Sequence, residues 1–241
     1  MLWRGITSKL QKIFPIAKHK SNVTFNGIQV HQRKVSLHHL TIKDLKQLFA
    51  SCQYTKVNYK NETYYNSLFG RIEKQYWKKI YMLPHLLPVD NKIKEMQYKI
   101  LFRFIATKKY LFQIKIASTP NCPLCYVHTH TMEHLFFECP TSKTFWLKLS
   151  EIWNFNNGDN VKLKLSDIIF GYKLGKLEEN IALNTIILLA KYYLYRGYIN
   201  EEKININNFK QRIARYVETF GSLKNKKNVS VVIKVQNSML N

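Results

Sequence analysis

Acidic side chains are scarce in this sequence. Its 241 residues include 15 Asp and Glu against 38 Lys and Arg, which leaves a formal net charge of +23 at pH 7. Enzymes that transfer nucleotides with two metal ions hold those ions with paired carboxylates. No two of the aspartates are adjacent, and the full set is Asp44, Asp90, Asp159 and Asp167. The sequence therefore argues against that chemistry, and it also lacks a glycine-rich phosphate loop or a Ser/His/Asp arrangement.

Cysteines and long apolar runs are also few. Four cysteines are too few for the disulfide framework of a secreted protein, and three of them fall within 18 residues. Such clustering indicates metal binding, whereas Cys52 stands apart and is expected to be a buried thiol. No apolar run reaches the roughly 18 residues that a membrane-spanning helix needs. We expect an intracellular protein of the nucleus or cytoplasm, without a membrane segment.

The first 43 residues contain no Asp or Glu but carry several lysines and arginines. Basic, acid-free segments of this kind are also typical of mitochondrial presequences. We favour the interpretation that the segment begins inside a longer parental protein. A secretory signal is not indicated, because no uninterrupted apolar stretch follows the first basic residues.

The basic residues that are present indicate a polyanionic partner, and nucleic acid is the commonest one. They comprise 31 Lys and 7 Arg, alongside 21 Asn and 15 Tyr. These abundant residues share A/T-rich codons, so mutational bias accounts for part of the lysine excess. Arginine reads bases and phosphates better than lysine, because its guanidinium is planar and bidentate. The composition therefore favours phosphate attraction with weak sequence preference, and no small-molecule substrate is indicated.

Hydrophobic periodicity predicts a mainly α protein. We expect an irregular basic segment over 1–60, a helical domain over 61–220 and a flexible basic tail over 221–241, in which 231–235 could pair as a strand. The first segment is expected to hold a short hairpin around Asn26-Gly27 and a short helix that begins at Thr41. Longer helices are predicted over 62–83, 91–107, 141–154, 178–198 and 208–220. The tyrosines in the fourth of these helices could stack on bases, but burial in the core is the preferred interpretation.

Two stripes run along the predicted 91–107 helix. The apolar one is expected to face the core and contains Ile93, Met96, Ile100 and Phe104. The basic one contains Lys92, Lys99 and Arg103. It is interpreted as a solvated face on which Glu95 pairs with Lys99, and contact with phosphates is the alternative.

The clustered cysteines form a recognisable metal-binding pattern. The order is Cys122-Pro-Leu-Cys125, eight residues, His134, four residues and Cys139. Three thiolates and one imidazole are an established zinc set, and they fill all four tetrahedral positions. The sequence therefore predicts a zinc knuckle over 119–140 with a structural or binding role. The alternative is that the cysteines are small buried hydrophobes.

Two other histidines, His128 and His130, lie in the eight-residue loop. Either could replace His134 as the ligand, although the spacing to Cys139 favours His134. Both are expected to be exposed bystanders. Phe136 and Phe137 flank the ligands and are expected to cover the metal.

These residues also carry a family resemblance. Cys122-Pro-Leu-Cys125, the run Thr131-Met-Glu-His134-Leu-Phe-Phe-Glu-Cys139-Pro140 and Phe145-Trp146 resemble the zinc-binding segment that follows the polymerase domain in LINE-type (non-LTR) retrotransposon reverse transcriptases. The resemblance extends over about 70–220 and is strongest at 98–146. The aromatic-x-Asp-Asp signature of that polymerase is missing. The resemblance thus implies the C-terminal portion of such a polyprotein, detached from its polymerase and endonuclease domains and without enzymatic activity.

In that family, this region helps the polymerase to hold nucleic acid. The resemblance therefore implies an accessory module that binds RNA or single-stranded DNA through zinc-ordered structure. The basic residues expected to line its surface are Lys92, Lys99, Arg103, Lys108, Lys109 and Lys115. The competing interpretations are a folded retrotransposon relic and a domesticated protein-interaction domain, in both of which zinc is purely structural.

Overall fold

The computed structural model describes residues 28–30, 33–35, 41, 60–221 and 226–240. The chain divides into two units, Met1–Val57 and Asn58–Asn241. In the first unit, strands β1 (Ile28–Val30) and β2 (Arg33–Val35) pair antiparallel, with Ile28 opposite Val35. The predicted turn at Asn26-Gly27 lies outside the described residues. The predicted helix after Thr41 and the thiol of Cys52 lie outside the described residues.

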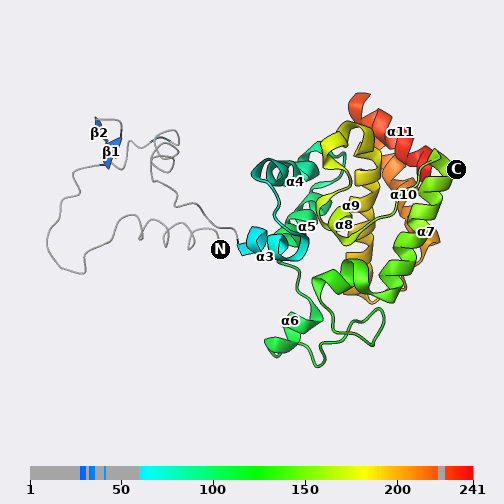
Figure 1. The fold of residues 1–241 in the computed structure, drawn as a ribbon, viewed down its shortest axis with the longest axis horizontal. Coiled ribbons are helices and arrows are strands. Elements are labelled where there is room, and N and C mark those ends of the chain that lie inside the picture. Colours follow the sequence, from blue (N-terminus) through cyan, green and yellow to red (C-terminus); the bar gives the residue numbers. More distant parts are fainter. Residues whose placement is uncertain (1–27, 31–32, 36–40, 42–59, 222–225, 241) are drawn as a thin grey trace. The chain divides into compact units, whose positions relative to one another are not determined.

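The second unit is helical, which confirms the mainly α prediction (Figure 1). It begins with α3 (Lys60–Phe69) and α4 (Lys74–Leu86), where the sequence predicted one helix over 62–83. Gly70 separates them at φ +84, a left-handed conformation that glycine adopts without steric cost. Helix α4 also continues through Pro84, which is buried in its last turn. A proline there removes a single helical hydrogen bond, so the helix continues to Leu86, three residues later than expected.

Helix α5 (Asn91–Leu101) begins at Asp90, whose carboxylate accepts a hydrogen bond from the backbone N–H of Ile93 at 3.0 Å. Ile93, Met96 and Ile100 are buried as predicted. Phe104 is not part of this stripe, because the helix ends at Leu101 and the Phe104 side chain is 75% exposed.

The long helix α9 (Leu177–Asn200) forms the centre of this unit. It is buried on almost every side, and its tyrosines pack inward as expected. Around it lie helices that the sequence predicted with small shifts of their ends, α7 (Pro140–Asn157) and α10 (Ile206–Gly221). The short helix α8 (Leu165–Phe170) and the 3-10 turn η3 (Leu174–Lys176) were not predicted.

The C-terminal segment is also helical, and the prediction of a flexible tail with a strand was wrong. Helix α11 (Lys226–Leu240) packs on α10, α7 and α9. Val232, Val235 and Met239 are buried, and their spacing is that of one helix face. The side-chain amide of Asn156 on α7 also donates a hydrogen bond to the carbonyl oxygen of Ser238 at 3.1 Å.

At the opposite end of the unit from α11, the short helix α6 (Lys108–Gln113) and the loops after it project from the body (Figure 1). This projection contains the first part of the predicted zinc knuckle. We call residues 103–131 the knuckle module; it includes Cys122 and Cys125, whereas His134 and Cys139 follow it in η2 (His134–Glu138) and at the start of α7. Among the described residues, no helix is both long and apolar enough to cross a membrane.

Candidate metal centre

The first half of the site is a closed loop. The backbone N–H of Tyr126 donates to the carbonyl oxygen of Cys122 at 2.7 Å, which bends Cys122-Pro-Leu-Cys125 into a turn. An antiparallel bridge between Asn121 and Thr129 closes the base of the loop. The backbone thus directs Cys122 and Cys125 toward one point, as the Cys-x2-Cys spacing requires.

The second half comes from a π-helical turn, η2 (His134–Glu138), that leads into α7. The backbone N–H of Cys139 donates to the carbonyl oxygen of His134 at 2.8 Å. A turn closed between residues five apart places those two residues together, which explains the four-residue spacing between the ligands. Pro140 then occupies the first position of α7, where its missing N–H costs no helical hydrogen bond.

The four predicted ligands meet at one place. The Sγ atoms of Cys122, Cys125 and Cys139 and a ring nitrogen of His134 all lie within 4.8 Å of one another. The Cys125 Sγ to His134 Nε2 distance is 3.4 Å. Zinc–sulfur bonds near 2.3 Å and zinc–nitrogen bonds near 2.0–2.1 Å in a tetrahedron imply roughly 3.5 Å for this edge. The donor set therefore fits Zn²⁺ bound through Nε2 of His134, and no coordination position is left for a catalytic water.

The burial of the ligands and the lowered pKa of one of them favour the binding of a cation. Cys122, His134 and Cys139 are buried, and Cys125 is half-buried. A hydrogen bond from Cys122 lowers the pKa of Cys139, against the opposing effect of burial. Backbone N–H groups of Thr141 and Ser142, at the start of α7, lower it further. The Cys139 thiolate is therefore the anion that the fold itself stabilises at this site.

Contacts around the ligands fasten the site to the helical body. The hydroxyl of Thr131 accepts a hydrogen bond from the backbone N–H of His134 at 3.0 Å. The indole N–H of Trp146 donates to the carbonyl oxygen of Phe136 at 2.6 Å. Phe136 is buried and Phe137 is half-buried against the core, consistent with their predicted covering role.

The loop histidines have separate positions. The His128 side chain is exposed, and its Nδ1 lies 3.9 Å from Cys125 Sγ, farther than His134 Nε2. His130 is fully buried, so the prediction of an exposed bystander was wrong for it. Its Nδ1 accepts a hydrogen bond from the backbone N–H of Lys108 at 2.9 Å, at the start of α6. His130 is therefore occupied in holding α6, and the geometry favours His134 as the ligand.

Half of the residues predicted to form the basic surface take part in ion pairs. Three of its members are paired with carboxylates: Lys99 with Glu95 at 2.7 Å, Lys108 with Glu201 at 3.7 Å, and Arg103 with Glu133. Within the described part of the chain, the other three have no ion pair, and all are exposed: Lys92, Lys109 and Lys115. Exposed pairs of this kind are weak, so Lys99 and Lys108 still contribute positive charge.

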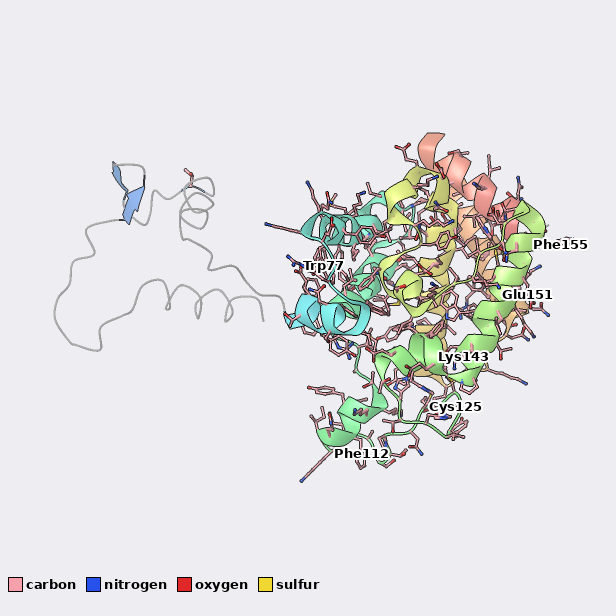
Figure 2. The ribbon with its side chains drawn as sticks, in the orientation of Figure 1. Trp77, Phe112, Cys125, Lys143, Glu151 and Phe155 are labelled. Atoms are coloured by element: carbon pink, nitrogen blue, oxygen red, sulfur yellow. The ribbon has the colours of Figure 1, made fainter. Side chains whose placement is uncertain are left out.

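The sequence did not predict that several aromatic side chains of the knuckle module are exposed. The knuckle module presents large rings that are about half or more exposed: Phe104, Tyr110, Phe112 and Tyr126. Figure 2 shows Phe112 and Cys125 at the same projecting end, while Phe155 lies at the far end of α7. Hydrophobic periodicity could not predict this exposure, because helices α5 and α6 end before an apolar pattern could repeat along them.

Comparison with known protein families finds a match to the segment that contains this site. Residues 59–146 match the family described as zinc-binding in reverse transcriptase. The match covers α3 to the beginning of α7 and includes all four clustered ligands. No curated protein and no solved structure matches the chain.

Proposed function

We propose that the protein is the nucleic-acid-binding accessory region of a LINE-type (non-LTR) retrotransposon reverse transcriptase, because residues 59–146 match the family described as zinc-binding in reverse transcriptase. Its ligand is RNA or single-stranded DNA. The knuckle module is the binding surface, and zinc holds that surface in shape.

The observation that carries this proposal is the backbone conformation of the module. Three of its residues, Arg103, Lys115 and Tyr126, have φ between +57 and +60. This left-handed conformation costs a non-glycine residue about 1 kcal/mol, so such positions are usually glycine. Two non-glycine residues elsewhere among the described ones share it, Lys173 and Glu201.

Two of these three positions end a helix. At the end of α6, the N–H of Ile116 donates to the Leu111 carbonyl at 2.8 Å, and the N–H of Lys115 donates to Phe112 at 3.0 Å. Arg103 occupies the equivalent position after α5, with the N–H of Phe104 donating to the Lys99 carbonyl at 2.7 Å. Glycine is the usual residue at this position, just after the last turn of a helix. Here a guanidinium and an ammonium occupy it, which supports a functional need for those side chains.

The side chains of the module suit a single strand. Lysine ammonium groups attract phosphates without reading sequence, and exposed rings stack on bases of any kind. Lys109 and Lys115 lie in the same segment as Tyr110 and Phe112. This combination of backbone attraction and stacking is typical of proteins that bind single-stranded nucleic acid.

A salt series tests the proposal. Binding of a fluorescent single-stranded oligonucleotide is measured by anisotropy at several salt concentrations. Each phosphate contact releases a counterion, so the logarithm of the affinity should fall with the logarithm of salt, with a slope of about −0.7 per contact. Replacing both Lys109 and Lys115 by Gln should make the slope shallower by about 1.4.

A matched control uses Lys162→Gln and Lys164→Gln, which lie between α7 and α8, outside the matched segment. This double variant loses the same charge and should keep the slope close to that of the wild type. If no strand binds at low salt, or if both double variants lower the slope equally, the proposal fails. A folded relic or a protein-interaction domain would then account better for the structural zinc.

A further inference from the structure

A pocket of about 700 Å³ opens between the knuckle module and α3. Its wall includes Tyr64 of α3, Arg103 and Phe104 after α5, Tyr110 of α6, and Glu133 next to the metal ligand His134. The volume is within the range of small-ligand sites. It also adjoins the proposed binding surface, since Lys109 and Tyr110 belong to both.

The polar part of the pocket is built from three side chains. The Arg103 guanidinium lies over the ring of Tyr64, with its carbon 3.7 Å from the ring centre. The same guanidinium pairs with Oε1 of Glu133, and the Tyr64 hydroxyl donates to that oxygen at 2.9 Å. The stacked guanidinium and the shared carboxylate hold one another in fixed orientations.

The Glu133 carboxylate forms an ion pair with Arg103 and accepts a hydrogen bond from the Tyr64 hydroxyl. A carboxylate held in such an ion pair accepts hydrogen bonds and repels phosphate. The pocket therefore favours a ligand that brings N–H donors, and a base edge is better suited to it than the sugar–phosphate backbone.

Aromatic rings lie at the opening. The side chain of Phe104 is 75% exposed, and that of Tyr110 is 54% exposed. The Phe104 ring is stacked with the ring of Phe102, with centroids 6.2 Å apart, yet most of its surface stays exposed, and exposed apolar surface gives no burial energy. A flat base could cover the exposed surface of Phe104 and Tyr110, and stacking on an aromatic side chain contributes about 1–3 kcal/mol.

We propose that this pocket binds one unstacked guanine base of a single strand. Guanine carries two adjacent N–H donors, N1–H and the 2-amino group, which one carboxylate accepts together. Its O6 and N7 are acceptors for arginine. The Arg103 and Glu133 pair thus complements guanine, whereas thymine and uracil offer one N–H between two carbonyls. This inference rests on the proposed function, and it adds base selection to the phosphate attraction of the lysines.

A purely structural ion pair is the competing explanation. It would join the end of α5 to the knuckle, and glycine at 103 would remove it while relieving the left-handed strain. Arg103→Gly therefore separates the two explanations. Guanine selection predicts that this variant keeps its zinc and its helical signal but loses preference for guanine.

The experiment compares three short DNA strands of equal length by fluorescence anisotropy. One is all thymidine, the second has one central deoxyguanosine, and the third has deoxyinosine there, which lacks the 2-amino group. The wild type should bind the guanine strand about fivefold or more tightly than the thymidine strand. The inosine strand should lose most of this advantage.

Three variants locate the effect. Phe104→Ala should weaken binding of the guanine strand, and Glu133→Gln should abolish the preference while leaving the salt slope unchanged. Phe155→Ala, which removes an even more exposed ring on α7, should change nothing. Zinc content and circular dichroism identify variants that fail to fold, and Arg103→Gly then replaces them.

The outcomes separate the two proposals. If no strand binds, the proposed function itself fails. If all strands bind equally, or if Phe104→Ala and Arg103→Gly leave the guanine preference intact, the base pocket is wrong and the phosphate-binding proposal stands. Preference for inosine equal to that for guanine would also overturn the assigned contact between the 2-amino group and Glu133.

Discussion

The ring of His130 stacks on the ring of Tyr198, with their centroids 4.2 Å apart. This contact joins the loop of the zinc knuckle to the central helix α9. The Tyr198 hydroxyl also donates to the carbonyl oxygen of Ala106 at 2.7 Å, just before α6. The projecting module is therefore anchored twice, by its metal ligands next to α7 and by this stacked pair on α9.

The anchor and the metal should be separable by mutation. His134→Ala removes a ligand and should greatly weaken zinc binding, because an incomplete set no longer encloses the ion. His130→Ala should keep zinc affinity but destabilise the fold by about 1–3 kcal/mol through loss of a buried, packed ring. A zinc competition titration with a chromophoric chelator measures the first effect, and urea unfolding measures the second. The reverse pattern would make His130 the ligand.

Removing the metal should unfold the knuckle module first. Structural zinc sites contribute on the order of 10 kcal/mol of apparent binding free energy, which is folding free energy for the segment that they hold. The helices around α9 have their own buried core, so they should lose less structure. Hydrogen exchange read by mass spectrometry, before and after chelation, should show loss of protection concentrated in 108–140. Uniform exchange unaffected by chelation would contradict this.

The metal site was predictable because its information is local. Four ligand-type residues with fixed spacing specify a tetrahedral set, and the backbone needs only short turns to assemble it. The long buried helix α9 was predictable for a related reason, since an apolar run of that length has few alternatives.

The pocket was not predictable, because its residues come from different segments. Tyr64, Arg103 and Glu133 are brought together by the packing of α3 against the module, and no sequence pattern links them. The end of α5 was missed for a related reason. A left-handed residue that is not glycine carries no signal in the sequence, so the helix was expected to continue to Phe104 and beyond.

The chain alone should show no template-directed nucleotide incorporation. The reason is chemical: the adjacent aspartates that would hold two metal ions are absent from the sequence. Primer extension with magnesium or manganese, on purified protein loaded with zinc, tests this. Incorporation that persists after gel filtration and follows the protein peak would contradict it.

A buried lysine gives the fold an unusual dependence on pH. Lys191 of α9 is fully buried, and its ammonium donates to the side-chain oxygen of Gln97 on α5. The Gln97 amide in turn donates to the carbonyl of Ile169 at 2.9 Å. Burial lowers the pKa of Lys191 to about 7 from an ordinary value of 10.5. No carboxylate is recorded in contact with it among the described residues, so the charge is stabilised by a neutral amide alone.

The sign of the effect follows from proton binding. Between about pH 7 and 10.5 the unfolded chain keeps the lysine protonated while the folded chain releases the proton, so this group makes stability rise with pH. Below pH 7 both states are protonated, and the full penalty of the buried charge is present. The change amounts to at most about 5 kcal/mol across the window. Lys191→Met should remove this rise, although it leaves the Gln97 oxygen without its donor.

The measurement is the free energy of unfolding in urea from pH 6.5 to 10, for the wild type and for Lys191→Met. Zinc ligands and tyrosines titrate in both proteins, so the difference between the two curves isolates Lys191. That difference should shift in favour of the wild type by several kcal/mol as pH rises through this window. A surface control, Lys148→Met on the exposed side of α7, should give a constant difference. If the Lys191→Met difference were equally constant, the lysine would be charged in both states, and solvent would have to reach it in the folded protein.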